Sequence, residues 1–478
     1  MRRISPGTGS PRSSSTDRPV ATHSQFRLLG KRRFLPFFCT QLLGAFNDNV
    51  FKQALILAIL FKLGTAADTS LLINLCALLF ILPFFLFSAL GGQFGERFEK
   101  AWLIRRIKFA EILIMLAGAL GMLLGNLPLL LVVLFCMGTQ SALFGPVKYS
   151  ILPQQLAEDE LVGGNALVEM GTFLAILGGT IGAGVLMANE AYAELVAVSV
   201  VLIALAGYLA SLAIPGGTAA LPTLHMDWHV LRQSWRILRL GFGQQRAVSR
   251  AMLGNSWFWF LGATYLTQIP AFAKDYLGGD ESVVTLILTL FSVGIALGSL
   301  LCERLSRHHV EIGLVPFGAI GLSLCGVLLW WHAGDHMTTA ATISWLALLG
   351  EPSNWWVLAD ILGLGIFGGL YIVPLYALIQ SRSVVHERSR VVAANNILNA
   401  LFMVMSAIIA IVLLVLLDLT IPQLFLVVSL LSVLVCGALF IDVPEFIERF
   451  LLWSLGERLG GVLLAQLRLR DEGARSGR

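Results

Sequence analysis

Long hydrophobic runs separated by short polar segments dominate this chain. A helix of roughly 20 residues crosses a hydrocarbon core about 30 Å thick, and the runs have about that length. A polar stretch at 215–250 divides them into two sets of six. The runs lie at about 34–61, 70–91, 102–123, 127–146, 161–187, 193–214, 251–273, 282–302, 311–331, 355–379, 391–417 and 421–442. The pattern predicts an all-α membrane protein with twelve transmembrane helices in two six-helix repeats.

The same pattern divides the rest of the chain. We expect residues 1–33, which are rich in Ser, Pro and Arg, to form a disordered basic tail. The N-terminal six-helix half follows at 34–214, and a linker with an amphipathic helix occupies 215–250. The C-terminal six-helix half spans 251–443, and an amphipathic tail follows it at 444–478.

Composition narrows the class of protein. The 478 residues are 57% hydrophobic and 13% charged, with a mean hydropathy of +0.80. A soluble globular protein carries about 25% charged residues, so a soluble domain is excluded. The six cysteines lie in or at the ends of hydrophobic runs without metal-ligand spacing. We therefore expect no disulfide, no metal site and no cofactor.

The distribution of Lys and Arg predicts the orientation in the membrane. With a cytoplasmic N-terminus, 30 of the 33 basic residues fall in cytoplasmic segments. The exceptions are Lys52 within the first run, and Lys62 and Lys274 on the opposite side. Such an excess marks the cytoplasmic side of a multi-pass protein. We therefore expect both termini in the cytoplasm.

Matching motifs in the two sets of runs indicate an internal repeat. The loop after the second run has a Gly–Glu–Arg–basic pattern that recurs with the same spacing after the eighth run. The first copy consists of Gly91, Glu96, Arg97 and Lys100, and the second of Gly298, Glu303, Arg304 and Arg307. The segment GPVKYSILPQ at 145–154, at the end of the fourth run, likewise has a counterpart in VPLYALIQ at 373–380, at the end of the tenth run. Two parallel repeats place the expected substrate site between them, near mid-membrane.

These features resemble the major facilitator superfamily, whose signature loop follows the second of twelve spans. The loop departs from the usual pattern because Glu96 stands where Asp is more common and Glu99 replaces a second glycine. The resemblance implies the major facilitator fold. The loops would then be gates that hold one conformation through salt bridges, although marking the cytoplasmic side is an equally simple role for them.

Four segments narrow the resemblance to the lysophospholipid transporter family. They are AFNDN at 45–49, FGPVKYSILPQQL at 144–156, GGNALVEM at 163–170 and YIVPLYALIQSR at 371–382. Within that family the chain resembles the transporter half of fusions with an acyltransferase and an acyl-carrier-protein ligase. The resemblance implies a bacterial inner-membrane transporter that moves lysophospholipids, lysophosphatidylethanolamine above all, from the outer to the inner leaflet for reacylation.

Asp48 is the leading candidate for a transport site. A helix that starts at about Leu35 rises ~1.5 Å per residue, which puts Asp48 roughly 20 Å along it and near mid-membrane. A carboxylate at that depth faces protein or a water-filled cavity and is a functional candidate by default. Asn47 and Asn49 flank it, and Lys52 lies four residues on, where an ion pair is favourable. The alternative is a structural pair that locks the first helix to a neighbour.

Further polar residues within the runs are candidates for binding a substrate headgroup. Lys148 would bind a phosphate beside Tyr149, although a lone lysine at the end of a span usually extends to the interface. Glu169 lies inside the fifth run without a local partner. Asn395 and Asn396 give the eleventh run a polar face, which would also serve contacts between helices.

Two other features have simpler interpretations. Glu111 has Lys108 three residues earlier and is expected to pair with it. In the linker, 225–240 places tryptophans and leucines on one helical face and arginines on the adjoining face. This pattern is typical of a basic amphipathic helix on the cytoplasmic leaflet, where membrane anchoring or attraction to anionic lipid would explain it.

No enzyme motif is present. The chain lacks a His-x4-Asp acyltransferase pair, a phosphate-binding G-x4-G-K-[ST] loop and a G-x-S-x-G elbow, so we expect no catalytic residues. The expected partners are a lysophospholipid substrate and membrane lipids, with a separate acyltransferase as a further candidate and no nucleic acid. Two alternatives stay open: an antiporter of a small soluble solute or drug, and a membrane scaffold that recruits an acyltransferase.

Overall fold

The computed structural model describes residues 24–63, 69–306, 309–334 and 342–456. In these ranges the chain is almost entirely helical, with twelve α-helices of 20 residues or more. The first six are α1 (Leu35–Ala58), α2 (Thr69–Arg97), α3 (Lys100–Leu123), α4 (Leu127–Gln155), α5 (Leu161–Met187) and α6 (Tyr192–Leu212). The second six are α8 (Arg246–Asp275), α9 (Glu281–Leu305), α10 (Leu314–Ala333), α12 (Asn354–Arg382), α13 (Arg388–Ile411) and α14 (Ile421–Asp442).

Shorter helices connect or precede the long ones. The linker contains α7 (Val230–Phe242), and the connection before α12 contains α11 (Trp345–Gly350). The 3₁₀ helices η1 (Gln25–Gly30) and η3 (Glu158–Glu160) precede α1 and α5. The expected helix in the linker is therefore present.

Several helices begin where a polar side chain caps them. Glu99, the residue that replaces a glycine in the signature loop, accepts hydrogen bonds from the backbone N–H groups of Ala101 and Trp102 and so starts α3. Asn126 caps α4 in the same way, and Thr420 caps α14. Such side chains satisfy N–H groups that have no partner inside the helix.

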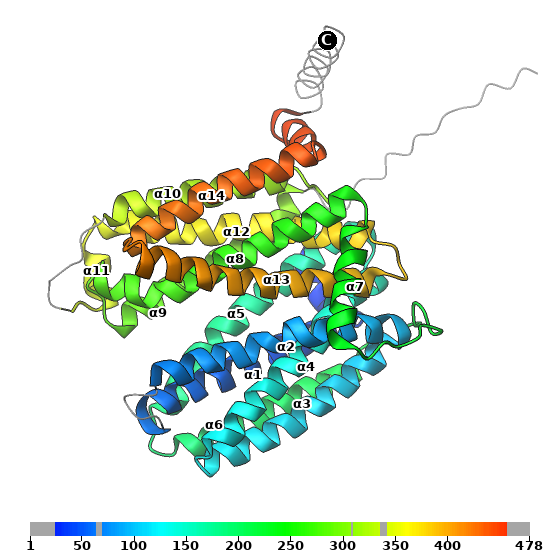
Figure 1. Ribbon diagram of the computed structural model, residues 1–478, viewed down its shortest axis with the longest axis horizontal. Helices are drawn as coiled ribbons and strands as arrows, with labels where there is room; N and C mark the ends of the chain where they lie inside the picture. Colours follow the sequence, from blue (N-terminus) through cyan, green and yellow to red (C-terminus); the bar gives the residue numbers. More distant parts are fainter. Residues whose placement is uncertain (1–23, 64–68, 307–308, 335–341, 457–478) are drawn as a thin grey trace, which may run out of the picture.

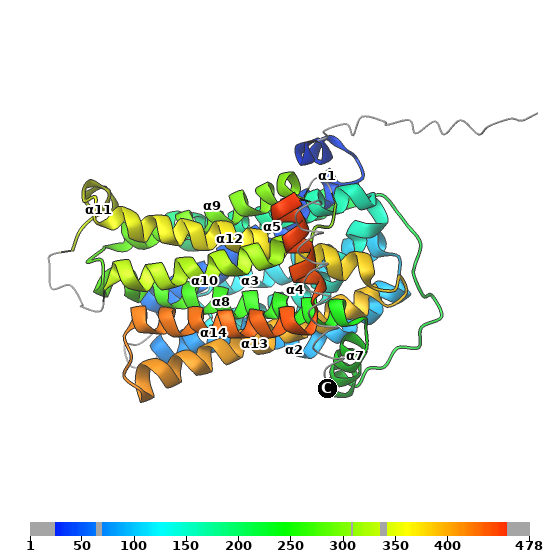
Figure 2. The ribbon, with the colours of Figure 1, turned by 90° about the horizontal axis from the view of Figure 1, so that it is seen from above.

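The long helices pack in two groups (Figure 1). In the first, α1 packs against α5 and α6, α2 against α4, and α3 against α4 and α6. In the second, α12 packs against α9 and α10, α10 against α14, and α8 against α13. The groups meet where α2 contacts α13 and where α5 contacts α9, and Figure 2 shows the long helices running roughly side by side.

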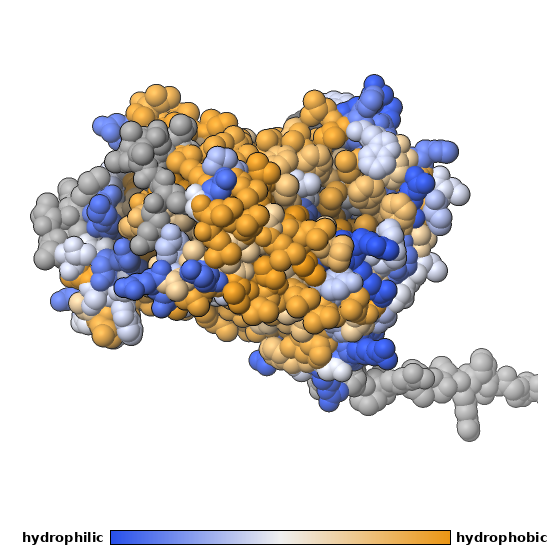
Figure 3. Space-filling model, turned by 90° about the horizontal axis from the view of Figure 1, so that it is seen from below, coloured by the Kyte–Doolittle hydropathy of each residue, from blue (hydrophilic) through white to orange (hydrophobic). Residues whose placement is uncertain are grey.

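Nine of the helices in the described ranges are long and apolar enough to cross a membrane. Of the twelve long helices, α1, α3 and α8 lie outside this set and carry more polar residues. Figure 3 shows a broad hydrophobic band across one face of the molecule, with hydrophilic residues toward both ends. This distribution is that of a multi-pass membrane protein, because lipid-facing surface must be apolar.

The segment before α1 corrects one expectation. Of the expected disordered tail at 1–33, only 24–33 lie within the described residues, and these are ordered. Gln25 and Leu28 of η1 are buried, and Lys31 and Arg33 form ion pairs with Glu160 at 2.5 and 2.6 Å. The pairs join the start of α1 to the start of α5, and a sequence pattern alone does not reveal such distant partners. The amphipathic tail at 444–478 lies outside the described residues beyond 456.

Candidate functional site

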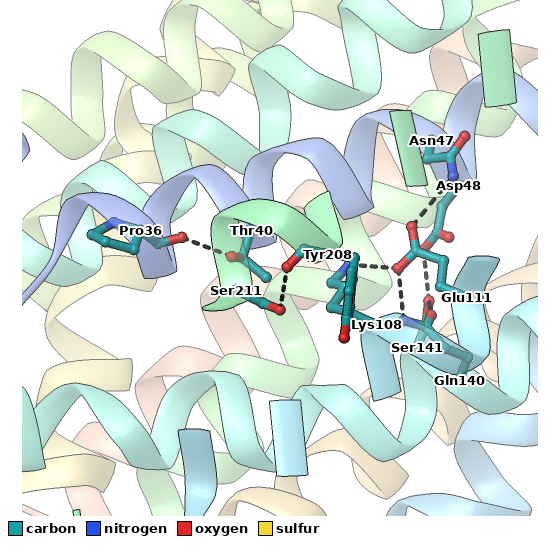
Figure 4. A network of polar contacts seen from close by, with 10 residues as sticks. All are labelled: Pro36, Thr40, Asn47, Asp48, Lys108, Glu111, Gln140, Ser141, Tyr208 and Ser211. Carbon is teal, nitrogen blue, oxygen red and sulfur yellow. Dashed lines mark hydrogen bonds and ion pairs between the residues drawn. The ribbon is translucent and has the colours of Figure 1, made fainter. Parts of the chain in front are cut away.

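Asp48 lies near the middle of α1 and is partly exposed. Its Oδ2 accepts a hydrogen bond of 2.6 Å from the hydroxyl of Ser141 on α4 (Figure 4). The expected ion pair with Lys52 is wrong. The Lys52 ammonium instead donates to Asn49 Oδ1 at 3.0 Å and lies 5.1 Å from the centre of the Phe80 ring. The spacing of four residues allowed the pair, but these partners draw the two side chains apart.

A second carboxylate, Glu111 on α3, is fully buried beside Asp48. Its Oε2 forms an ion pair of 2.6 Å with Lys108, as the sequence predicts, and accepts a hydrogen bond of 3.0 Å from Gln140. Its Oε1 accepts from Asn47 Nδ2 at 3.3 Å. Each charge in this pair therefore has a charged partner, and the amides around it satisfy the remaining lone pairs.

Gly44 makes space for the lysine of this pair. A Cβ atom at this position of α1 would lie 2.2 Å from the Lys108 ammonium. A side chain at this position would displace the Lys108 ammonium from the place where it pairs with Glu111.

Ser141 links the two carboxylates. Its hydroxyl lies 2.6 Å from Asp48 Oδ2 and 3.1 Å from Gln140 Oε1, and Gln140 in turn contacts Glu111. A hydroxyl has a single proton and donates it to one acceptor at a time. A change in the charge at Asp48 therefore alters the hydrogen bonding that reaches the buried ion pair.

Lys148 on α4 lies partly exposed, without a carboxylate of the described residues within 4.0 Å. Its ammonium donates to Thr172 Oγ1 of α5 at 3.0 Å and lies 5.1 Å from the centre of the Tyr149 ring. Thr172 also lies 3.2 Å from Gln41 Oε1 of α1. The lysine is thus held by neutral groups only.

Tyr149 and Glu169 form a contact at the boundary between the two groups of helices. The Tyr149 hydroxyl donates to Glu169 Oε1 at 2.6 Å, and its ring stacks on Tyr376 of α12 with centroids 4.2 Å apart and an interplanar angle of 6°. The hydroxyl of Tyr376 accepts from Trp259 Nε1 at 3.4 Å. Among the described residues, the other carboxylate oxygen of Glu169 has no partner.

The other predicted polar residues make contacts between or within helices. Asn395 accepts a hydrogen bond of 3.1 Å from Asn255 on α8. Asn396 lies against α4, where a Cβ at Gly145 would come within 2.4 Å of its side-chain nitrogen. Asn49 donates to the carbonyl of Ala45 at 2.7 Å. In this structure the three asparagines therefore fit the simpler interpretation of helix contacts.

At one end of the bundle, hydrogen bonds join the two groups of helices. We call it the latch end; it is the end at which α2 finishes at Arg97 and α3 starts at Lys100. Glu96 Oε1 accepts a hydrogen bond of 2.6 Å from the backbone N–H of Ser389, in the first turn of α13. Asn165 and Gln380 exchange two hydrogen bonds of 2.8 Å.

The second copy of the signature loop makes a different contact. Glu303 Oε2 accepts a hydrogen bond of 3.0 Å from the backbone N–H of Gln25 in η1. Its Oε1 lies where a Cβ at Gly163, in the first turn of α5, would come within 2.6 Å. In both copies of the loop, the acid therefore lies at the start of a helix of the other group: Glu96 at α13 and Glu303 at α5. Only Glu303 also contacts η1.

The remaining loop residues pack rather than pair. Gly91 and Gly298 allow close helix approach, since an added Cβ would lie 2.9 Å from the carbonyl oxygen of Leu143 and 1.9 Å from that of Ile366, respectively. Arg97 lies over the ring of Phe98, Lys100 is buried and Arg304 is exposed. Arg307 lies outside the described residues.

Sequence reasoning missed several uncharged members of this site. Gln140, Ser141 and Thr172 bind the charged residues directly. Gln41 and Trp259 contact Thr172 and Tyr376, respectively. The available signal was the position of glutamine and hydroxyl side chains inside hydrophobic runs. That signal is weak because such residues commonly bond only to their own helix, as Thr139 does to Phe135.

Comparisons with known proteins agree with the resemblance drawn from the motifs. No protein-family model matches the chain. The lysophospholipid transporter LplT of Serratia proteamaculans (strain 568) is 27% identical over 368 residues, which cover 77% of this chain and 82% of that protein. The transporter of the same name from Salmonella heidelberg (strain SL476) is 29% identical over 350 residues, covering 73% and 79%. The chain is thus a relative of lysophospholipid transporters.

Solved structures identify the fold. The human organic anion transporter MFSD10 (TETRAN) matches with a TM-score of 0.69 at 13% identity, over 85% of this chain and 99% of that chain. The E. coli fucose:proton symporter FucP matches with a TM-score of 0.64 at 13% identity, over 86% and 99%. The chain has the major facilitator fold, as the motifs predicted.

Proposed function

We propose that this chain, a relative of lysophospholipid transporters with the major facilitator fold, carries lysophospholipids across a bacterial inner membrane. Lysophosphatidylethanolamine is the substrate we expect, moving from the outer to the inner leaflet, where a separate acyltransferase would restore the second acyl chain. All twelve long helices would cross the membrane, with both termini in the cytoplasm. The two six-helix halves, 34–214 and 251–443, would rock about the site to expose it to each side in turn.

One observation carries this proposal. Asp48 and Lys148 are opposite charges, both partly exposed within the helix bundle, and no ion pair of the described residues joins either to another side chain. An unpaired charge inside a membrane protein is costly and marks a functional site. A zwitterionic headgroup supplies the missing partners, since its ammonium suits Asp48 and its phosphate suits Lys148. The single acyl chain would stay in hydrocarbon.

The contacts at the latch end are compatible with entry of a substrate from the outer leaflet. The excess of Lys and Arg supports a cytoplasmic location for this end. There Glu96 contacts Ser389 and Tyr149 stacks on Tyr376, so the site is closed on that side. FucP, which shares the fold, has been solved in an outward conformation. A substrate would enter from the outer leaflet and leave once these contacts separate.

A soluble-solute antiporter is the second candidate. The fold hosts many substrates, and the structural neighbours include a transporter named for organic anions and one named for fucose. The observation that favours it is the hydrogen-bonded carboxylate of Asp48, which suits a coupling proton or cation. A scaffold that recruits an acyltransferase would need neither charge.

Uptake of labelled lysophosphatidylethanolamine into proteoliposomes tests the proposal. The variants are Asp48→Asn and Lys148→Gln, and Lys274→Gln, which removes an exposed charge from α8, is the matched control. A hydrogen bond to a charged group is worth about 1.5–3 kcal/mol, so each site variant should lower uptake roughly 10- to 100-fold. The control should match the unmodified protein.

Three outcomes would contradict parts of the proposal. Uptake no greater than in empty liposomes would refute lysophospholipid transport and the use of this site for it. Full uptake by both site variants would be consistent with the proposed substrate but would show that Asp48 and Lys148 do not bind it. Equal competition by soluble glycerophosphoethanolamine would favour the solute antiporter, because that molecule has the headgroup without the acyl chain.

A further inference from the structure

The linker helix α7 crosses the seam between the two halves. Figure 1 shows it running across the long helices near the latch end, and Figure 2 places it beside α2 and α13 at the edge of the bundle. It packs against both of these helices. A short helix in this position lies in the plane of the membrane rather than across it, at the depth where spanning helices end.

The first end of α7 is fastened to α2. The side chain of Gln93 makes two hydrogen bonds, of 3.0 and 3.2 Å, with the backbone N–H and carbonyl of Asp227 just before α7. The hydroxyl of Ser234 donates to the carbonyl of Phe85 at 3.3 Å. These bonds attach α7 to the N-terminal half.

The other end of α7 is fastened to the C-terminal half. At Gly241 a Cβ would lie 2.7 Å from the Met252 side chain of α8 and 2.8 Å from that of Ala394 on α13. Just beyond the helix, Gln244 donates to Glu387 at 2.8 Å, immediately before α13. The helix therefore spans from one half to the other, and separating α2 from α13 requires it to release one of them.

The face of α7 that points away from α2 and α13 is exposed and carries both apolar and basic side chains. On this face Leu231 and Trp235 expose 67% and 71% of their surface, which is unusual for large apolar side chains. Just before the helix, Trp228 is 65% exposed, although one edge of its ring contacts Phe94 of α2 with centroids 6.0 Å apart. Tryptophans of this kind favour the headgroup region of a bilayer. The apolar part of the face therefore fits a membrane surface better than water.

Three arginines share this exposed face: Arg232, Arg236 and Arg239. Arg236 forms an ion pair of 2.7 Å with Asp227. Within the described part of the chain, Arg232 and Arg239 have no carboxylate within 4.0 Å. A guanidinium group matches the oxygens of a phosphate with two parallel hydrogen bonds, so these two arginines have the chemistry of phosphate ligands.

We propose that α7 binds anionic phospholipid headgroups of the leaflet at the latch end, and that bound lipid holds the α2–α13 seam closed. Arg232 and Arg239 would take the headgroup phosphates while Trp228 and Trp235 enter the interface. Attraction between anionic lipid and basic side chains falls off within a Debye length, so the contact depends on salt. The binding surface is independent of the transported molecule, and only the effect on transport rests on the proposed function.

Hydrogen–deuterium exchange of the full-length chain in nanodiscs tests the surface directly. The discs contain phosphatidylcholine alone or with phosphatidylglycerol, and the readout is exchange of the amides of Val230–Phe242. We expect anionic lipid to slow this exchange several-fold and high salt to remove the effect. The double variant Arg232→Gln/Arg239→Gln should lose the dependence on phosphatidylglycerol, and Arg232→Lys/Arg239→Lys should keep most of it.

Arg106→Gln is the matched control, since it removes an exposed arginine from α3 that lies over Trp102 and not on α7. Its exchange in 230–242 should respond to phosphatidylglycerol as in the unmodified protein. The proposal would be overturned if phosphatidylglycerol did not change exchange in 230–242 of the unmodified protein. It would also be overturned if phosphatidylglycerol slowed exchange equally in the glutamine double variant.

Uptake of lysophosphatidylethanolamine into proteoliposomes made from the same two lipid mixtures tests whether bound lipid acts on the α2–α13 seam. If bound lipid holds the seam closed, phosphatidylglycerol should lower uptake several-fold in the unmodified protein and not in the glutamine double variant. Lipid-dependent exchange with lipid-independent uptake would overturn the effect on the seam but not the binding surface. A complete lack of lysophospholipid uptake would instead refute the proposed function, while the exchange result would still decide the surface.

Discussion

Two sets of charges lie close together in the first six helices, and they are arranged in opposite ways. Lys108 and Glu111 are 1% and 2% exposed and form an ion pair of 2.6 Å, with amides on the remaining oxygens. Asp48 and Lys148 are partly exposed and bonded only to neutral hydroxyls and an aromatic ring. The first set is satisfied within the protein. The second set has capacity for an external partner.

The difference separates stability from function. A buried pair that loses one partner leaves an uncompensated charge, which is strongly destabilising. A charge that already lacks a charged partner loses little stability when it is neutralised, but it loses its interaction with a ligand. We therefore expect substitutions in the first set to affect folding and those at Asp48 and Lys148 to affect transport.

The largest effect is expected for Lys108→Met. This change leaves the Glu111 carboxylate buried without its cation and should cost roughly 3–5 kcal/mol of stability. Unfolding of the purified protein in detergent, measured against Asp48→Asn, checks the prediction. The double variant Lys108→Met/Glu111→Met should recover much of the loss, because it removes both charges. Equal stability of Lys108→Met and Asp48→Asn would show that the two sets do not differ in this way.

A smaller effect is expected for Gly44→Ala. The new Cβ would lie 2.2 Å from the Lys108 ammonium, so the lysine must move away from its partner or α1 must shift. Forced crowding of this kind costs typically about 1–3 kcal/mol. The same unfolding measurement applies, with Gly184→Ala as control because an added Cβ there has no neighbour within 4 Å. Equal stability of the two variants would contradict the prediction.

The smallest effect is expected for Lys52→Gln. The lysine does not pair with Asp48, and its bond to Asn49 is between a charged and a neutral group on the same helix. Because the amide of glutamine can donate a hydrogen bond in place of the ammonium, we expect a change in stability within about 1 kcal/mol. Uptake of lysophosphatidylethanolamine should stay within about threefold of the unmodified protein, far above that of Asp48→Asn. A loss as large as that of Asp48→Asn would restore a joint role for the two residues.

Much of the candidate site was visible in the sequence because charge inside a hydrophobic run is rare. Asp48, Lys148 and Glu169 stand out for that reason alone. Tyr149 was expected beside Lys148, but Ser141 and Thr172 did not stand out, because they are side-chain types that also occur at lipid-facing or packed positions. Which uncharged residue meets which charge depends on how α4 and α5 are rotated toward α1, and periodicity does not report that rotation.

The sequence by itself predicted the approximate positions of the long helices, the repeat of the signature loop and the Lys108–Glu111 pair. These follow from local physics: hydrophobic length, motif spacing and contacts within one helix turn. Only the tertiary structure decided that Asp48 binds Ser141 rather than Lys52 and that η1 forms a hydrogen bond with Glu303. It also decided that α7 packs against both α2 and α13. Each of these contacts joins segments distant in the chain. Their free energy depends on the packing of whole helices, which no single stretch of sequence contains.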